Sequence, residues 1–127
     1  MGNYLNPGNE KFRRMIQSEI YVDKTGLIEK TNAVLDTRQK FLCVSRPRRF
    51  GKSMAADMLA AYYERGEDAD LLFRSLKISK AESYRAHLNQ YDVIKVNIQE
   101  FLSMTGSMDE MLSMLKKYLV FDLMEHF

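Results

Sequence analysis

Several residue types are scarce in this 127-residue chain, and each scarcity excludes a class of protein. Cysteine occurs only once, at Cys43, so a small domain held by internal disulfides is excluded. No apolar run approaches the roughly 20 residues that cross a bilayer. The N-terminal residues lack the charged and apolar regions of a signal peptide. We therefore expect a cytoplasmic protein without a membrane anchor.

Negative charge is missing from one stretch of the chain. The net charge is only +2, yet no Asp or Glu lies between Thr37 and Ala56. Basic residues are concentrated in the same window: Arg38, Lys40, Arg46, Arg48, Arg49 and Lys52. One cationic segment in an otherwise balanced chain indicates a local site for an anionic ligand rather than a generally basic protein.

The apolar pattern predicts helices and two strands. The expected helices cover residues 10–19, 25–32, 53–65, 79–89 and 107 to near the C-terminus. The last two begin at Ser-x-x-Glu capping boxes, Ser79–Glu82 and Ser107–Glu110. The apolar run at 40–45 and the β-branched run at 92–98 are the expected strands. Strands separated by helices are typical of a parallel sheet, so the predicted fold class is α/β.

A phosphate-binding loop of the Walker A type is predicted between the first expected strand and the next helix. It comprises Arg46, Pro47, Arg48, Arg49, Phe50, Gly51, Lys52 and Ser53. Amides at the helix N-terminus would bind phosphate oxygens, Gly51 permits a close approach, and Lys52 would reach the outer phosphates. The Ser53 hydroxyl would ligate Mg²⁺ held through the nucleotide. Because Arg46 stands where the general pattern has glycine, a basic turn preceding a helix stays an alternative interpretation.

Two motifs make the chain resemble a known family. The segments Tyr-Val-Asp-Lys-Thr-Gly at 21–26 and Ser-Arg-Pro-Arg-Arg-Phe-Gly-Lys-Ser at 45–53 are similar to the bacterial AAA-ATPase-like family of predicted P-loop ATPases. Leu-Asn-Pro-Gly-Asn at 5–9 and Ala-Tyr-Tyr at 61–63 also fit, so the resemblance covers essentially the whole chain. It implies that Arg46 is the family's own variant of the loop. It also implies a site for ATP (or GTP) with Mg²⁺.

The resemblance further implies parts that this sequence lacks. Family members often carry a C-terminal nuclease domain of the restriction-endonuclease type. In such ATPases, acidic Walker B residues at the end of a later strand hold Mg²⁺ and polarise water. Here Asp122 and Glu125 fall on the last expected helix instead. We therefore expect residues 1–127 to be an N-terminal, three-layer fragment of a P-loop NTPase domain, with an N-terminal helical segment and a partial parallel sheet. It would bind nucleotide with little or no hydrolysis.

Partners other than nucleotide follow from the expected fold and charge. A partial sheet leaves unpaired edges and little cover for the Met-rich last helix, so self-association or a rearranged sheet is expected. The alternative function is a nucleic-acid-binding or protein-interaction module that uses the basic loop Arg46–Lys52. No interleaved aromatics support stacking on bases, which ranks nucleic acid lower.

The residues Asp23, Lys24 and Thr25 allow two interpretations. They could contact the nucleotide or its loop, because the resemblance pairs the two motifs. Alternatively, Asp23 and Thr25 could cap the short helix that follows them, and this is the preferred interpretation.

Overall fold

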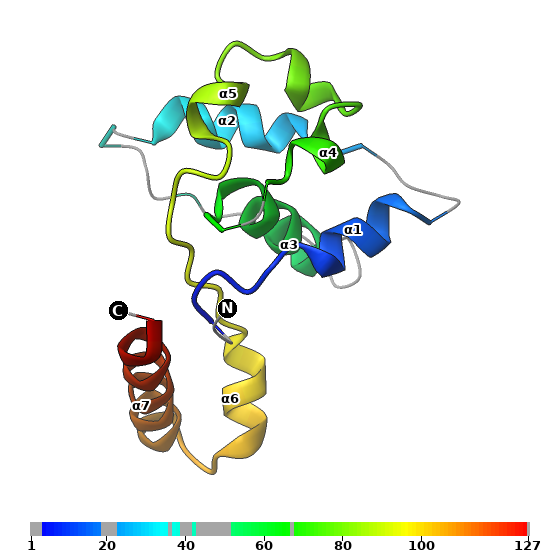
Figure 1. Cartoon of the computed structure of the whole chain (residues 1–127). Coiled ribbons are helices and arrows are strands. Elements are labelled where there is room, and N and C mark those ends of the chain that lie inside the picture. Colours follow the sequence, from blue (N-terminus) through cyan, green and yellow to red (C-terminus); the bar gives the residue numbers. More distant parts are fainter. Residues whose placement is uncertain are drawn as a thin grey trace. The chain divides into compact units, whose positions relative to one another are not determined.

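The computed structural model describes residues 4–18, 23–35, 37, 38, 42, 52–66 and 68–126. Over these residues the chain forms helices joined by short connections, and the only β pairing is two isolated bridges (Figure 1). Contacts divide the chain into two compact units. We call Gly8–Tyr91 the central unit, and Met1–Pro7 with Asp92–Phe127 the terminal unit.

In the part of the chain that the structure describes, the central unit is built from six helices, five of them short. They are α1 (Glu10–Ile16), α2 (Gly26–Val34), α3 (Lys52–Tyr63), α4 (Asp70–Phe73), the 3₁₀ helix η1 (Lys77–Lys80) and α5 (Tyr84–His87). The longest, α3, is rich in Ala, Met and Leu, the residues with the highest helix propensity. The chain leaves α3 through Gly66, whose φ of 120° is open to glycine but rarely to other residues.

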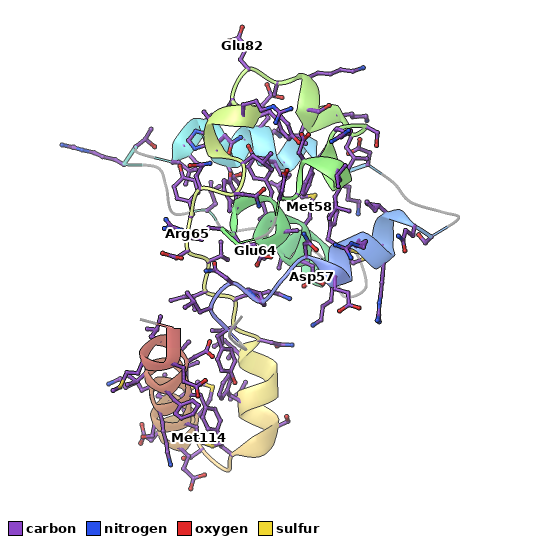
Figure 2. All side chains as sticks on the ribbon, viewed as in Figure 1. Asp57, Met58, Glu64, Arg65, Glu82 and Met114 are labelled. Carbon is purple, nitrogen blue, oxygen red and sulfur yellow. The ribbon has the colours of Figure 1, made fainter. Side chains whose placement is uncertain are left out.

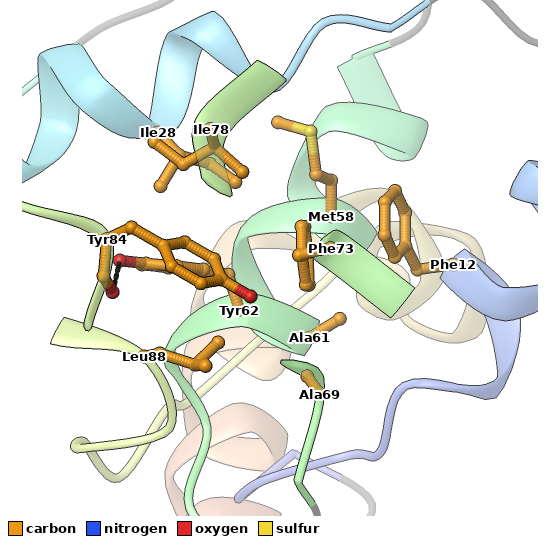
Figure 3. Packing of buried hydrophobic residues seen from close by; sticks show 10 residues of the cluster. All are labelled: Phe12, Ile28, Met58, Ala61, Tyr62, Ala69, Phe73, Ile78, Tyr84 and Leu88. Carbon is orange, nitrogen blue, oxygen red and sulfur yellow. Dashed lines mark hydrogen bonds between the residues drawn. The ribbon is translucent and has the colours of Figure 1, made fainter. Parts of the chain in front are cut away.

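The core of the central unit gathers side chains from every one of these helices (Figure 3). Its members are Phe12, Ile28, Met58, Ala61, Tyr62, Ala69, Phe73, Ile78, Tyr84 and Leu88. The rings of Phe12 and Phe73 stack with centroids 4.8 Å apart, which ties α1 to α4. Tyr62 meets Phe73 edge-on at 5.6 Å, so α3 lies at the middle of the aromatic packing.

The terminal unit consists of a helical hairpin and the N-terminal segment. Its helices are α6 (Ile98–Met104) and α7 (Met108–His126). Phe101 is fully buried, with its ring 5.7 Å from Tyr4 and 5.9 Å from Tyr118. The serine half of the capping box at the start of α7 is present, because Ser107 Oγ accepts from the N–H of Glu110. The Glu110 carboxylate accepts from the N–H of Gly106, one residue before the expected donor.

The predicted α/β fold with a parallel sheet is wrong: the described residues are helical and contain no strand. Where the strand at 92–98 was expected, the chain makes one antiparallel bridge, Leu5↔Ile94, and Ile98 already begins α6. β-Branched residues favour a strand only where neighbouring strands pair with them, and here the partner is three residues of the N-terminal segment. The strand expected at 40–45 lies outside the described residues apart from Leu42, which has no regular structure.

The helix predicted at 79–89 is also wrong, although the other predicted helices are present within a few residues. Ser79 lies inside η1 rather than before it, and its hydroxyl donates to the carbonyl of Leu76 at 2.8 Å. The backbone becomes extended at Ala81, and α5 starts only at Tyr84. A serine that bonds its own upstream turn cannot cap the following residues, so the capping-box pattern fails here.

Candidate functional site

The predicted nucleotide loop runs into the start of α3. Residues 46–51 lie outside the described part of the chain, as does Cys43. The backbone of Lys52 and Ser53 is described, and Lys52 is the first residue of the 12-residue helix. The first backbone N–H groups of an α-helix have no partner within the helix and carry the positive end of its dipole.

Electrostatics at the start of α3 favour an anion. The first turn of the helix has no acidic residue, and the first carboxylate along it is that of Asp57. In Figure 2, Asp57 and Met58 lie at the middle of α3, and Glu64 and Arg65 lie just beyond its end. The negative side chains of this segment therefore do not stand at its first turn.

The last turn of α3 is capped by Asn89, a residue that sequence reasoning missed. Asn89 has a left-handed φ of 56°, and its backbone N–H donates to the carbonyl of Tyr62 at 2.8 Å. Its Nδ2 donates to the carbonyls of Glu64 (2.7 Å) and Ala61 (3.4 Å). Its Oδ1 accepts from the N–H of Ala69 at 2.9 Å. Asparagine is the residue other than glycine that most readily adopts this backbone shape, which is the one signal in the sequence.

Backbone pairing next to Asn89 extends this cap. The N–H of Tyr91 donates to the carbonyl of Tyr63 at 2.9 Å, and the N–H of Arg65 donates to the carbonyl of Tyr91 at 2.8 Å. This is the parallel bridge Glu64↔Tyr91. The residues expected to lead into a second strand thus close the end of α3 instead.

Asp23 and Thr25, which the sequence assigned to a helix cap or to the nucleotide, bind the backbone of η1. The Asp23 carboxylate accepts from the N–H of Lys77 at 2.8 Å and from the hydroxyl of Thr25 at 2.6 Å. Thr25 is fully buried, and its Oγ1 accepts from the N–H of Ile78 at 3.1 Å. Thr25 occupies the N-cap position of α2 without a side-chain capping bond, so the capping interpretation is wrong for Thr25. Asp23 does bind the entrance of the helix, because its Oδ1 accepts from the backbone N–H of Thr25 at 2.9 Å.

The charge of Asp23 is stabilised by these contacts. Burial alone raises the pKa of its carboxyl, but the hydrogen bonds from Thr25 and Lys77 outweigh burial and leave the pKa below its usual value. We call this pair and the two η1 amides the Asp23–Thr25 clamp. It joins two segments of the central unit that are more than fifty residues apart in sequence.

Hydroxyl groups around the core form a second polar cluster. The hydroxyl of Tyr62 donates to the carbonyl of Tyr84 at 2.7 Å (Figure 3), and the hydroxyl of Tyr63 donates to Asn32 Oδ1 at 2.6 Å. Burial raises the pKa of Tyr63 to about 12, in spite of its bond to Thr31. The hydroxyls of Thr31, Tyr62 and Tyr63 each have a partner inside the protein, as buried polar groups require.

The Asp70 carboxylate contacts one tyrosine hydroxyl and two arginines at the edge of the same core. The hydroxyl of Tyr84 donates to Asp70 Oδ1 at 2.7 Å, and Arg74 and Arg85 lie within 3.2 and 3.4 Å of the carboxylate. The bond from Tyr84 is the main cause that lowers the pKa of Asp70. Burial and the bond to Asp70 raise the pKa of Tyr84.

Asp122 lies on α7, a helix as predicted, and binds the N-terminal segment of the terminal unit. Its carboxylate is nearly buried and accepts from the N–H groups of Tyr4 (2.9 Å) and Leu5 (2.8 Å). No local sequence pattern indicates this contact, because the residues involved are 117 and 118 positions apart.

The comparison with protein families decides the identity of the chain. The family model described as Predicted AAA-ATPase matches residues 7–126. The chain belongs to the predicted AAA-ATPase family. No curated protein and no solved structure matches it. The family match extends over both units, including Lys52 at the start of α3.

The part of the chain that the structure describes lacks both a metal-binding cluster and a membrane-spanning helix. No cluster of three metal-binding side chains occurs there. None of the helices in the same residues is long and apolar enough to cross a membrane.

Proposed function

We propose that this predicted AAA-ATPase binds ATP with Mg²⁺ at residues 46–53. The observation that carries the proposal is the 12-residue helix that begins at Lys52, directly after a loop sequence of the P-loop kind. A helix that opens at a Gly-Lys-Ser sequence presents unpaired amides and a dipole to a phosphate group. Membership of an ATPase family supports the same ligand.

Each loop residue has a role in this proposal. Gly51 lets the backbone approach the phosphates, and Lys52 places an ammonium at the β- and γ-phosphates. Ser53 ligates Mg²⁺, whose remaining ligands are nucleotide oxygens and water. Arg48 and Arg49 add positive charge on the loop and favour a polyphosphate over a single carboxylate.

The proposal covers binding with little or no hydrolysis. Hydrolysis needs groups that position water and stabilise charge, in addition to the loop lysine. Three carboxylates are already engaged within the protein: Asp23 with η1, Asp70 with Tyr84, and Asp122 with the N-terminal segment. None of these three is assigned to the attacking water.

The test compares ATP binding by the wild type, Lys52→Ala and Lys116→Ala. A fluorescent ATP analogue is titrated with Mg²⁺ at constant salt, with unlabelled GTP as competitor to define the base preference. Lys116 is exposed on α7 in the terminal unit, so its replacement removes the same charge from a residue outside the predicted loop. We expect Lys52→Ala to lose binding and Lys116→Ala to retain it.

Two results would refute the proposal. Equal affinity of the wild type and Lys52→Ala would show that the loop lysine does not bind the nucleotide. Binding of an oligonucleotide with steep salt dependence, without any binding of Mg·ATP, would support the alternative function of the basic loop.

A further inference from the structure

From the geometry of α3 we infer that Asn89 is a positioning residue for the nucleotide site. The inference rests on the proposed function, because it concerns the placement of Lys52 and Ser53 relative to the phosphates. Asn89 lies at the opposite end of α3 from these residues and acts through the helix, without touching the ligand.

The described side chains of α3 are held mainly in its second half. Met58, Ala60, Ala61 and Tyr62 are exposed by 3% or less. In the first half, Met54 is 51% exposed, and residues 55–57 are only partly buried. Packing therefore holds the end of the helix that is remote from the proposed phosphate site more firmly than the end that carries it.

A helix held at one end transmits small tilts to its other end. Twelve residues at a rise of 1.5 Å make α3 about 18 Å long, so a tilt of about 5° at the held end moves the first turn by roughly 1.5 Å. Amide-to-phosphate hydrogen bonds act within a few tenths of an ångström of their best distance. A displacement of this size is enough to weaken phosphate binding.

Asn89 is the residue that sets this held end. Its donors satisfy carbonyls of Ala61, Tyr62 and Glu64, while its Oδ1 binds the N–H of Ala69 next to α4. It thereby fixes the last turn of α3 against the start of the following helix. Without the side chain, the carbonyls of Ala61 and Glu64 lose its bonds, and the last turn is held by core packing and the backbone bonds of Asn89 and Tyr91 alone.

Two substitutions remove the Nδ2 bonds to the carbonyls of Ala61 and Glu64 while keeping the backbone shape. Asn89→Gly adopts a left-handed φ freely and keeps the N–H bond to Tyr62. It loses the Nδ2 bonds to Ala61 and Glu64 and the Oδ1 bond from Ala69. Asn89→Asp keeps an acceptor for Ala69 and loses the Nδ2 donor. Ile28→Val is the control, because it trims the same core on α2 rather than on α3.

The experiment measures Mg·ATP affinity at a temperature where circular dichroism shows every variant fully folded. We expect both Asn89 variants to bind roughly tenfold more weakly than the wild type, and Ile28→Val to bind normally although its melting temperature falls. Wild-type affinity in the Asn89 variants would overturn the inference and leave the proposed function intact. Loss of the fold in both variants would also overturn it, since Asn89 would then be a folding determinant. Equal binding by the wild type and Lys52→Ala would instead refute the proposed function.

Discussion

Replacing Thr25 by valine tests the Asp23–Thr25 clamp with almost no change in side-chain shape. The substitution removes the acceptor for the N–H of Ile78 and the hydroxyl that donates to Asp23. A buried N–H left without a partner costs about 1 to 3 kcal/mol, and a hydrogen bond to a charged group contributes about 1.5 to 3 kcal/mol. Because the two losses share one atom, we expect Thr25→Val to lower the free energy of unfolding by about 2 to 4 kcal/mol.

The matched control is Thr25→Ser, which keeps the hydroxyl and removes one methyl group. Burial of a methyl-sized group contributes about 0.8 kcal/mol, so this variant should lose clearly less stability. Urea unfolding followed by circular dichroism measures both, with the denaturant dependence of the free energy unchanged. If valine and serine destabilise the protein equally, the hydroxyl contributes nothing and the reasoning about the clamp fails.

Three further outcomes follow from the described contacts. Burial raises the pKa of Tyr63 to about 12, so its neutral hydroxyl should contribute fully to the free energy of unfolding below about pH 10. This contribution should decline as the pH rises toward 12, and the unfolding midpoint measured across alkaline pH tests it. Ser107→Ala should cost about 1 kcal/mol of stability by removing a cap, while Ser113→Ala, exposed within α7, should cost nothing, as thermal melts can compare. Asp122→Asn should destabilise the terminal unit by about 1 to 3 kcal/mol, measured as faster amide exchange at Leu5.

Helices were predictable from this sequence where local chemistry determines them. The Ala-rich segment of α3 and the capping box at Ser107 act within a few residues, and both helices are present. Local pattern failed where a distant partner competes. Ser79 bonds its own upstream turn, and the β-branched run at 92–98 meets only a short N-terminal segment.

The candidate site was predictable only in part for the same reason. The place where the loop meets a helix follows from the Gly-Lys-Ser sequence, and α3 begins there. The contacts of Asp23, Thr25 and Asn89 join segments more than twenty residues apart, which no local pattern specifies. The expectation of self-association rested partly on unpaired sheet edges, and in the described residues no sheet supplies them. The exposed apolar side chains Val120, Phe121 and Met124 leave self-association a prediction.

The terminal unit is discontinuous, because Tyr4 and Leu5 meet Asp122 across almost the whole chain. During translation, the residues that complete it emerge after the whole sequence of the central unit. Closing so long a loop slows folding, and the unit is therefore expected to assemble after the central one. Deleting either the segment that holds Tyr4 and Leu5 or the part of α7 that holds Asp122 would then damage the same structure.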